Sequence, residues 1–92
     1  MNPTQKLSKD KQLLISTFKD LETKQELSKF LEDLLTEDEI LDLAQRLKIA
    51  KLLLDGKTYD EIAEKVGTST ATVSKIGQVI KYGQGAFKKQ LT

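Results

Sequence analysis

The chain has 92 residues, of which 38% are hydrophobic and 32% charged, and this balance is typical of one small globular domain. Cysteine and histidine are absent, which excludes disulfides, thiol nucleophiles and the usual zinc sites, so we expect no metal and no cofactor. No apolar run approaches the roughly 20 residues of a membrane helix, and the start lacks the apolar core of a signal peptide. We therefore expect a cytoplasmic protein without a membrane partner. An enzyme is disfavoured, with no catalytic residue expected, because no glycine-rich phosphate loop or nucleophile elbow is present.

Every element that the sequence predicts is a helix, since no segment alternates apolar and polar residues with the period of a strand. Capping boxes begin at Thr23, Thr36 and Thr58, each with a glutamate three residues later that can reach back to the helix start. Together with the spacing of apolar residues, they predict helices over residues 5–21, 24–34, 37–54, 59–65 and 70–82, and a final turn or short helix over residues 86–91. Gly56 and Gly67 are expected to end the third and fourth helices.

The first three predicted helices carry more apolar residues than one narrow stripe requires. Their spines are Leu7, Leu14, Phe18 and Leu21, then Leu27, Phe30, Leu31 and Leu34, then Ile40, Leu43, Leu47, Ala50 and Leu54. The residues that widen these faces are Leu13, Leu35, Leu41, Leu52 and Leu53. Such an excess is typical of a helical dimer interface, with a tight monomeric core as the alternative. We expect one domain over residues 1–92, in which residues 1–55 form the helical core and dimerise.

Two short apolar stripes flank a turn in the second half of the chain. Ile62 and Val66 lie four residues apart on one predicted helix, and Val73, Ile76 and Ile80 follow at helical spacing on the next. A glycine in the turn between them permits a positive φ. This spacing predicts a helix-turn-helix over residues 58–82, in which the second helix enters a DNA major groove.

The outer side of that second helix carries residue types that suit base and phosphate contacts. It consists of Thr70, Ala71, Ser74, Lys75, Gln78 and Lys81, with Thr68 and Ser69 at the helix start. Lysine reaches guanine or phosphate, glutamine pairs with adenine, and hydroxyls at a helix start suit a phosphate. Residues 68–92 hold four lysines and no acidic residue, so this part is basic. Each residue alone is more often a solvated side chain or a helix cap, and only the joint pattern favours double-stranded DNA as the partner.

From Leu34 onward, "LLTEDEILDLAQRLKIAKLLLDGKTYDEIAEKVGTSTATVSKIGQVIKYG" resembles the Trp repressor family, most closely its shorter Trp-repressor-like branch. The resemblance implies an all-α, Trp-repressor-like helix-turn-helix fold and an intertwined helical homodimer built through the N-terminal helices. A two-fold dimer would place its two recognition helices about 34 Å apart, one turn of DNA. After Gly85 we do not expect the longer last helix of the founding members, because "AFKKQLT" holds too few residues for it, and whether any helix forms there stays open.

The same resemblance bears on a possible effector pocket. Founding members bind tryptophan between two arginines, with a glycine after the second and a threonine at the entrance. Arg46 and Thr36 match the first arginine and the threonine, whereas Lys75 and Ile76 replace the second arginine and the glycine. Lysine lacks the planar guanidinium that stacks on a ring, and isoleucine takes up space, so a response to tryptophan is not expected and another effector stays open. Arg46 has two interpretations, a contact to an anion in an altered pocket or a salt bridge to a nearby acid.

These observations favour a sequence-specific DNA-binding transcriptional regulator, a repressor that acts as a homodimer. The alternative is a protein-interaction module in which the helix-turn-helix is only a structural unit. Substitution of Lys75 distinguishes the two, because it would weaken DNA binding only under the first interpretation.

Overall fold

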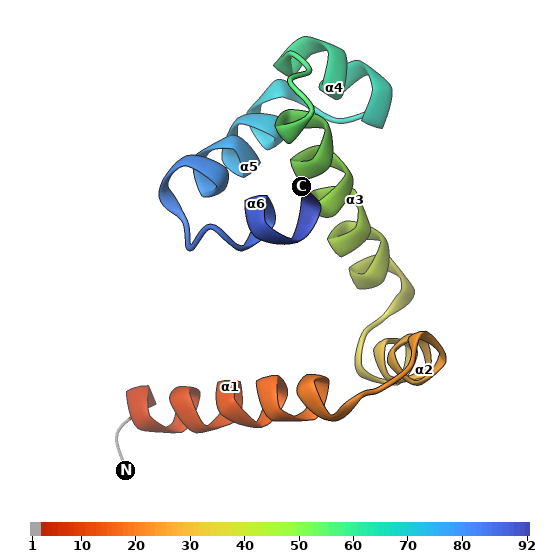
Figure 1. Ribbon diagram of the computed structural model, residues 1–92, viewed down its shortest axis with the longest axis vertical. Coiled ribbons are helices and arrows are strands. Elements are labelled where there is room, and N and C mark those ends of the chain that lie inside the picture. Colours follow the sequence, from red (N-terminus) through yellow and green to blue (C-terminus); the bar gives the residue numbers. More distant parts are fainter. Residues whose placement is uncertain (1–2) are drawn as a thin grey trace. The chain divides into compact units, whose positions relative to one another are not determined.

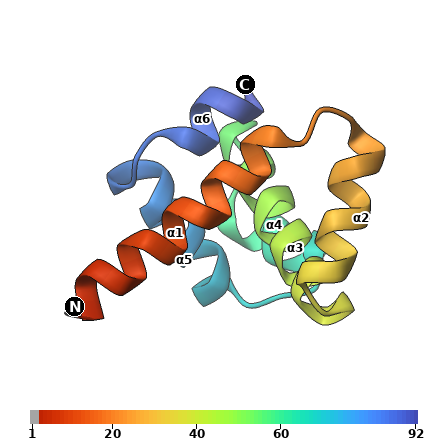
Figure 2. The same ribbon diagram turned by 90° about the horizontal axis from the view of Figure 1, so that it is seen from below.

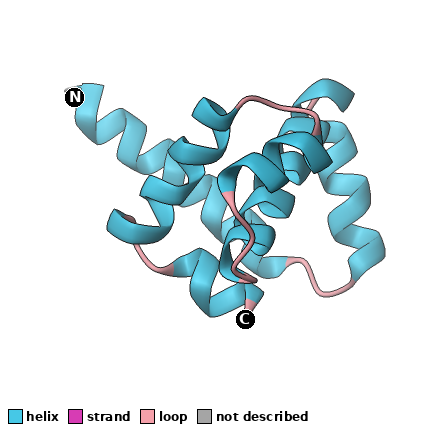
Figure 3. Ribbon diagram, turned by 90° about the horizontal axis from the view of Figure 1, so that it is seen from above, coloured by secondary structure: helices cyan, strands magenta, loops and turns pink. Residues whose placement is uncertain are grey.

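The computed structural model describes residues 3–92, with side chains from Ser8 onward, so the predicted position of Leu7 lies outside the described side chains. Within that range the chain forms helices joined by short loops and no strand (Figure 1, Figure 3). The helices are α1 (Pro3–Asp20), α2 (Lys24–Leu34), α3 (Glu37–Leu54), α4 (Tyr59–Val66), α5 (Thr70–Tyr82) and α6 (Ala86–Leu91). The all-α prediction is confirmed, and the last segment is a short helix rather than a turn.

The described chain divides into two compact units, Met1–Glu37 and Asp38–Thr92. The first unit contains α1 and α2, which meet at an aromatic pair. The rings of Phe18 and Phe30 lie 5.4 Å apart between centroids at an interplanar angle of 87°, the edge-to-face geometry that the ring quadrupole favours. This contact joins the end of α1 to the middle of α2.

The start of α2 differs in one detail from the predicted capping box. The Thr23 hydroxyl accepts a hydrogen bond from the Glu26 amide at 3.0 Å, as predicted. The Glu26 carboxylate accepts instead from the amide of Glu22 at 2.9 Å, one residue before the cap. The extended backbone of Thr23 places the preceding amide within reach of the carboxylate, so the reciprocal half of this box was wrongly predicted. The box predicted at Thr36 stays a prediction.

The predicted burial of α2 was wrong. None of its residues is buried: Leu27 and Leu34 are exposed, whereas Phe30 and Leu31 are half-buried. Two helices that meet along one narrow line cover only one side of each other, and the remaining apolar surface of α1 and α2 stays in solvent. Leu13 is 69% exposed and Ile15 is 55% exposed.

The second unit holds the hydrophobic core of the described chain. Its buried members are Ile49, Ala50, Ile62, Val73 and Ile76, contributed by α3, α4 and α5. Partly buried side chains packed around them are Leu52, Leu53, Tyr59, Ala63, Val66, Ile80, Phe87 and Leu91. The predicted packing of the helix-turn-helix stripes against each other is therefore confirmed.

The face of α3 that enters this core differs from the predicted one. Leu43 and Leu47 belong to the predicted spine but are exposed, and Ile49, which the spine omitted, is fully buried. The core forms at the C-terminal half of α3, where α4 and α5 pack. Because α3 is apolar on several sides, its sequence alone does not single out the buried face.

Candidate nucleic-acid interface

The first helix of the helix-turn-helix starts with a complete capping box and ends at a glycine. The Thr58 hydroxyl accepts from the Glu61 amide at 3.2 Å, and the Glu61 carboxylate accepts from the Thr58 amide at 3.0 Å. At the other end Gly67 adopts φ 78°, a left-handed conformation that costs a residue with a Cβ free energy. The amides of Gly67 and Thr68 both donate to the Ala63 carbonyl, at 2.9 and 3.0 Å, which closes the turn. These bonds fix how the chain enters α5.

Ser69 is the N-cap of α5 and its hydroxyl is engaged within the protein. It accepts from the Thr72 amide at 3.2 Å and lies 3.1 Å from the Thr72 hydroxyl. Ser69 and Thr72 lie at the first turn of α5, where free amides point outward and the helix dipole favours a negative charge. Thr68 is half-buried and Ser69 is exposed. A phosphate contact by either residue stays a prediction.

The two sides of α5 differ in burial. Val73, Ile76 and Gly77 are buried on the inner side. The predicted DNA-facing residues lie on the other side. Ser74 is half-buried, and the exposed ones are Thr70, Ala71, Lys75, Gln78 and Lys81. The exposed set therefore lies on one accessible helix surface.

Sequence reasoning missed the contact that sets how closely α4 approaches α5. A Cβ built on Gly77 would lie 2.6 Å from the hydroxyl oxygen of Tyr59, so the tyrosine occupies the place of the missing side chain. The available signal was a lone glycine inside a helical pattern, which often marks a close approach. Sequence reasoning also passed over Val79 and Tyr82, which are exposed apolar residues on α5.

A groove of about 550 Å³ runs between α3 and α5. Its walls are Asp42, Gln45 and Arg46 from α3, Thr72, Lys75, Ile76 and Val79 from α5, and Phe87 from α6. Three predicted effector-pocket residues, Arg46, Lys75 and Ile76, are thus brought together, whereas Thr36 lies in the other unit. Ile76 is 8% exposed and belongs to the core, and the groove stays open beside it. The absence of a tryptophan response stays a prediction.

The salt bridge considered for Arg46 is not found among the described side chains. The ion pair within them joins Lys51 and Asp55, with Nζ and a carboxylate oxygen 3.4 Å apart. Arg46 is exposed on the rim of the groove. The anion contact considered for Arg46 stays a prediction.

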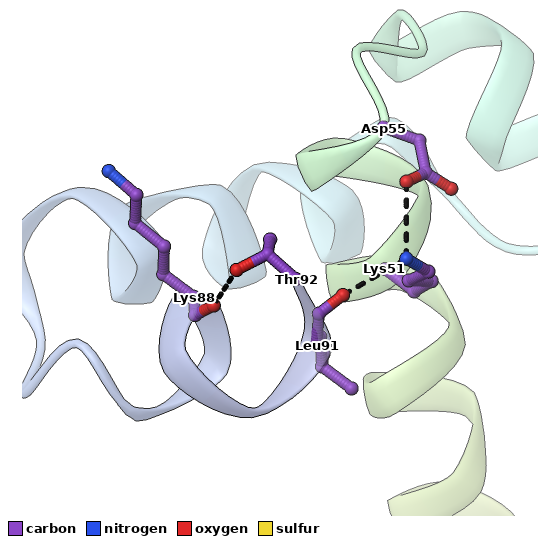
Figure 4. A network of polar contacts seen from close by, with 5 residues as sticks. All are labelled: Lys51, Asp55, Lys88, Leu91 and Thr92. Atoms are coloured by element: carbon purple, nitrogen blue, oxygen red, sulfur yellow. Dashed lines mark hydrogen bonds and ion pairs between the residues drawn. The ribbon is translucent and has the colours of Figure 1, made fainter.

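The last helix lies beside α3 in the second unit (Figure 2). The ammonium group of Lys51 donates to the Leu91 carbonyl at 3.0 Å, and the same group faces Asp55 (Figure 4). The Thr92 hydroxyl donates to the Lys88 carbonyl. A second cavity, of about 300 Å³ and apolar, lies between the end of α5 and α6.

The described residues form neither a metal site nor a membrane-spanning helix. No group of three or more acidic, histidine or cysteine side chains is placed there to hold a metal ion. None of the helices in residues 3–92 combines the length and the apolar character that crossing a membrane requires.

Comparison with known proteins places the chain in a family. The model of the Trp repressor protein family matches residues 9–92. An uncharacterized protein of Bacillus subtilis, YerC, is 43% identical over 77 residues, which cover 84% of this chain and 71% of the relative. A Trp operon repressor homolog of Chlamydia trachomatis is 38% identical over 74 residues, covering 75% and 79%. The crystal structure of a TrpR-like protein from Eubacterium eligens superimposes with a TM-score of 0.80 at 38% identity, covering 85% of this chain and 80% of that one. With this family match over most of its length and the helix-turn-helix fold described above, the chain belongs to the Trp repressor family.

Proposed function

We propose that the protein is a DNA-binding transcriptional regulator, a repressor, that reads the major groove through α5. The observation that carries the proposal is the division of α5 into a buried apolar side and an exposed side with lysine, glutamine and hydroxyl groups. Residues 68–92 hold no acidic side chain, so this surface does not repel phosphate. Membership of a family of transcription regulators supports the same function.

The first test is selection of bound duplexes from a random library at about 150 mM salt, because lower salt exaggerates non-specific binding. We expect enrichment of a pseudo-palindrome whose half-sites lie about 34 Å apart, one helical turn. Selection of no sequence, with and without added amino acids, would count against the proposal.

Lys75→Ala tests the role of α5 directly. If Lys75 contacts a base, the selected duplex should bind about 1–3 kcal/mol more weakly; if it contacts phosphate, the salt slope should fall by about one. Lys24→Ala is the matched control, since Lys24 is exposed at the start of α2 and carries the same charge. Equal binding by both variants would remove α5 from the interface.

We place the dimer interface on residues 1–55, within a single domain of residues 1–92 that reads DNA through residues 58–82. The exposed apolar surface of α1, α2 and α3 supports this assignment. It includes Leu13 at 69%, Leu41 at 60% and Leu47 at 48% exposure. Exposed large apolar side chains in such numbers are typical of an association site. A sedimentation experiment should give twice the mass of one chain.

DNA binding is proposed not to require tryptophan. Lys75 offers no guanidinium plane for an indole ring, and Ile76 occupies core space beside the groove. The chain contains no tryptophan, so fluorescence of added tryptophan reports binding without background. We expect no saturable change in that fluorescence and no change in duplex affinity. Saturable binding would overturn this part of the proposal and would leave DNA recognition intact.

The second candidate is a protein-interaction module that uses the helix-turn-helix only as a structural unit. The observation that favours it is the exposure of two apolar residues on α5, Val79 and Tyr82, the latter 79% exposed. Under this function the selection experiment enriches no duplex, and Lys75→Ala leaves every measured property unchanged.

A further inference from the structure

The last helix is too short to be stable by itself. α6 spans six residues, fewer than an isolated helix needs in water, so its order comes from contacts with the rest of the second unit. Phe87 and Leu91 lie four residues apart, which places them on one face, and both are half-buried against the core. Gln90 lies on the exposed side.

Both ends of α6 are attached to neighbouring helices. At its C-terminal end, the Leu91 carbonyl accepts from Lys51 of α3 at 3.0 Å, a favourable place for a cation near the negative end of the helix dipole (Figure 4). At its N-terminal end, a three-residue loop ties it to α5, and the Gly83 amide donates to the Val79 carbonyl at 2.8 Å. α6 therefore bridges α3 and the end of α5.

Phe87 borders both cavities of this region. It forms a wall of the groove that Arg46, Lys75 and Ile76 also line, and it lines the smaller apolar cavity beside Ile80. A ring in this place fills part of the space between α3 and α5. Without it, α5 would lose one of its apolar supports.

We propose that Phe87 is a positioning residue, which α6 holds in the groove between α3 and α5 so that α5 keeps its orientation without a bound effector. The inference rests on the proposed function in one respect, namely that α5 reads DNA. The phenyl ring supplies within the chain the apolar contact that a small molecule would otherwise have to supply. The Lys51–Leu91 hydrogen bond keeps α6, and hence the ring, in place.

The experiment compares Phe87→Ala and Phe87→Leu with Gln90→Ala, a control on the exposed side of the same helix. Hydrogen exchange of the free proteins is measured first. We expect amides of residues 70–82 to exchange about tenfold faster in Phe87→Ala, while those of residues 59–66 change little, because only α5 loses its support. Phe87→Leu should lie between, and Gln90→Ala should match the parent protein.

Duplex binding is the second readout. In Phe87→Ala we expect α5 to hold its DNA-binding orientation about a tenth of the time, so the apparent affinity for the selected duplex should fall about tenfold. The salt slope should not change, because no phosphate contact is lost. Toluene, which fits a cavity left by a phenyl ring, should restore binding of Phe87→Ala and leave the parent protein unaffected. If Phe87 only stabilised the fold, toluene would not restore duplex binding at a temperature where Phe87→Ala is already folded.

Parent-like exchange over residues 70–82 in folded Phe87→Ala would overturn the proposal, as would a tenfold loss that toluene does not restore. If Phe87→Ala does not fold, Lys51→Met is measured in the same way, since it keeps the aliphatic stem and removes the bond to Leu91 together with the ion pair to Asp55, for which Asp55→Asn is the control. The parent protein separates the two proposals. If it selects no duplex while Phe87→Ala still loosens α5, the DNA-binding function fails and the positioning role stands.

Discussion

The two units of the chain use their apolar residues in opposite ways. In the unit Asp38–Thr92, three helices converge and bury Ile49, Ile62 and Val73 to 1% exposure or less. In the unit Met1–Glu37, α1 and α2 meet at one aromatic pair, and Leu13 and Ile15 remain mostly in solvent. Helix length does not explain the difference, because α1 and α3 have 18 residues each.

This difference shows that the amphipathic spacing of apolar residues does not by itself bury a helix. It needs a second and a third surface that come to it from different directions. In the second unit the tight turn at Gly67 supplies them, since it folds α4 back against α5. In the first unit the chain offers a single partner helix, and much of the remaining apolar surface is exposed.

The largest expected effect comes from the core of the second unit. Ile49→Ala should lower the free energy of unfolding by about 2–5 kcal/mol, since it leaves a cavity where three helices meet. Ile15→Ala in α1 removes the same atoms from an exposed site and serves as the matched control. Urea unfolding with a circular dichroism signal measures both. Equal losses, independent of protein concentration, would mean that the two units do not differ as described.

The exposed face of α1 gives the next largest effect if it is the dimer interface. Leu13→Glu should weaken self-association by about 1.5–3 kcal/mol, the value of burying one leucine side chain. Gln12→Glu introduces the same charge on a neighbouring exposed residue and should change association little. Sedimentation over a range of concentrations measures the dissociation constant. An unchanged constant in Leu13→Glu would move the interface away from this face.

The contact between α4 and α5 predicts a smaller loss. Gly77→Ala should cost about 1–2 kcal/mol, because the new methyl group meets the Tyr59 hydroxyl, and the higher helix propensity of alanine offsets part of that clash. Removing the hydroxyl should restore stability, so the double variant Tyr59→Phe with Gly77→Ala is expected to be more stable than Gly77→Ala alone. Thermal unfolding of the three variants measures this. No rescue in the double variant would show that another contact limits the approach.

The smallest effects come from the helix caps. Thr58→Ala should lower stability by about 1 kcal/mol, since it breaks a complete capping box on a helix that supplies the buried Ile62. Thr23→Ala should cost less, because fraying of α2 exposes no buried residue. Chemical denaturation of both variants, alongside Thr17→Ala as a half-buried threonine within α1 that caps no helix, gives the comparison. A larger loss at Thr23 would indicate that α2 is buried in the protein as it exists in solution.

Local signals in the sequence predicted much of the fold. The capping box at Thr58, the glycine at Gly67 and the stripes around Ile62 and Val73 predicted a helix-turn-helix that the structure confirms. They could do so because the partners in the cap and in the turn lie within about one helical turn of one another, and because each stripe repeats along its own helix, so the pattern records these features directly. The exposed residues of α5 followed from the same periodicity.

Where partners lie far apart in the chain, the sequence was a poor guide. The spine predicted for α3 included Leu43 and Leu47, which are exposed, and it omitted Ile49, which is buried. The choice of face depends on where α4 and α5 arrive, and a helix that is apolar on several sides carries no record of it. The place of Arg46 beside Lys75 in one groove was predicted, but through the family resemblance rather than through the spacing of residues.

The sequence by itself determined the helices, their starts and ends, the turn at Gly67 and membership of the family, because these depend on local chemistry and on the order of residue types. Only the tertiary structure decided which side of α3 is buried, that Tyr59 fills the space above Gly77, and that α6 returns to α3 through Lys51 and Leu91. These contacts join residues between 18 and 40 positions apart. Their geometry follows from packing several helices at once, and packing depends on shape in three dimensions rather than on spacing along the chain.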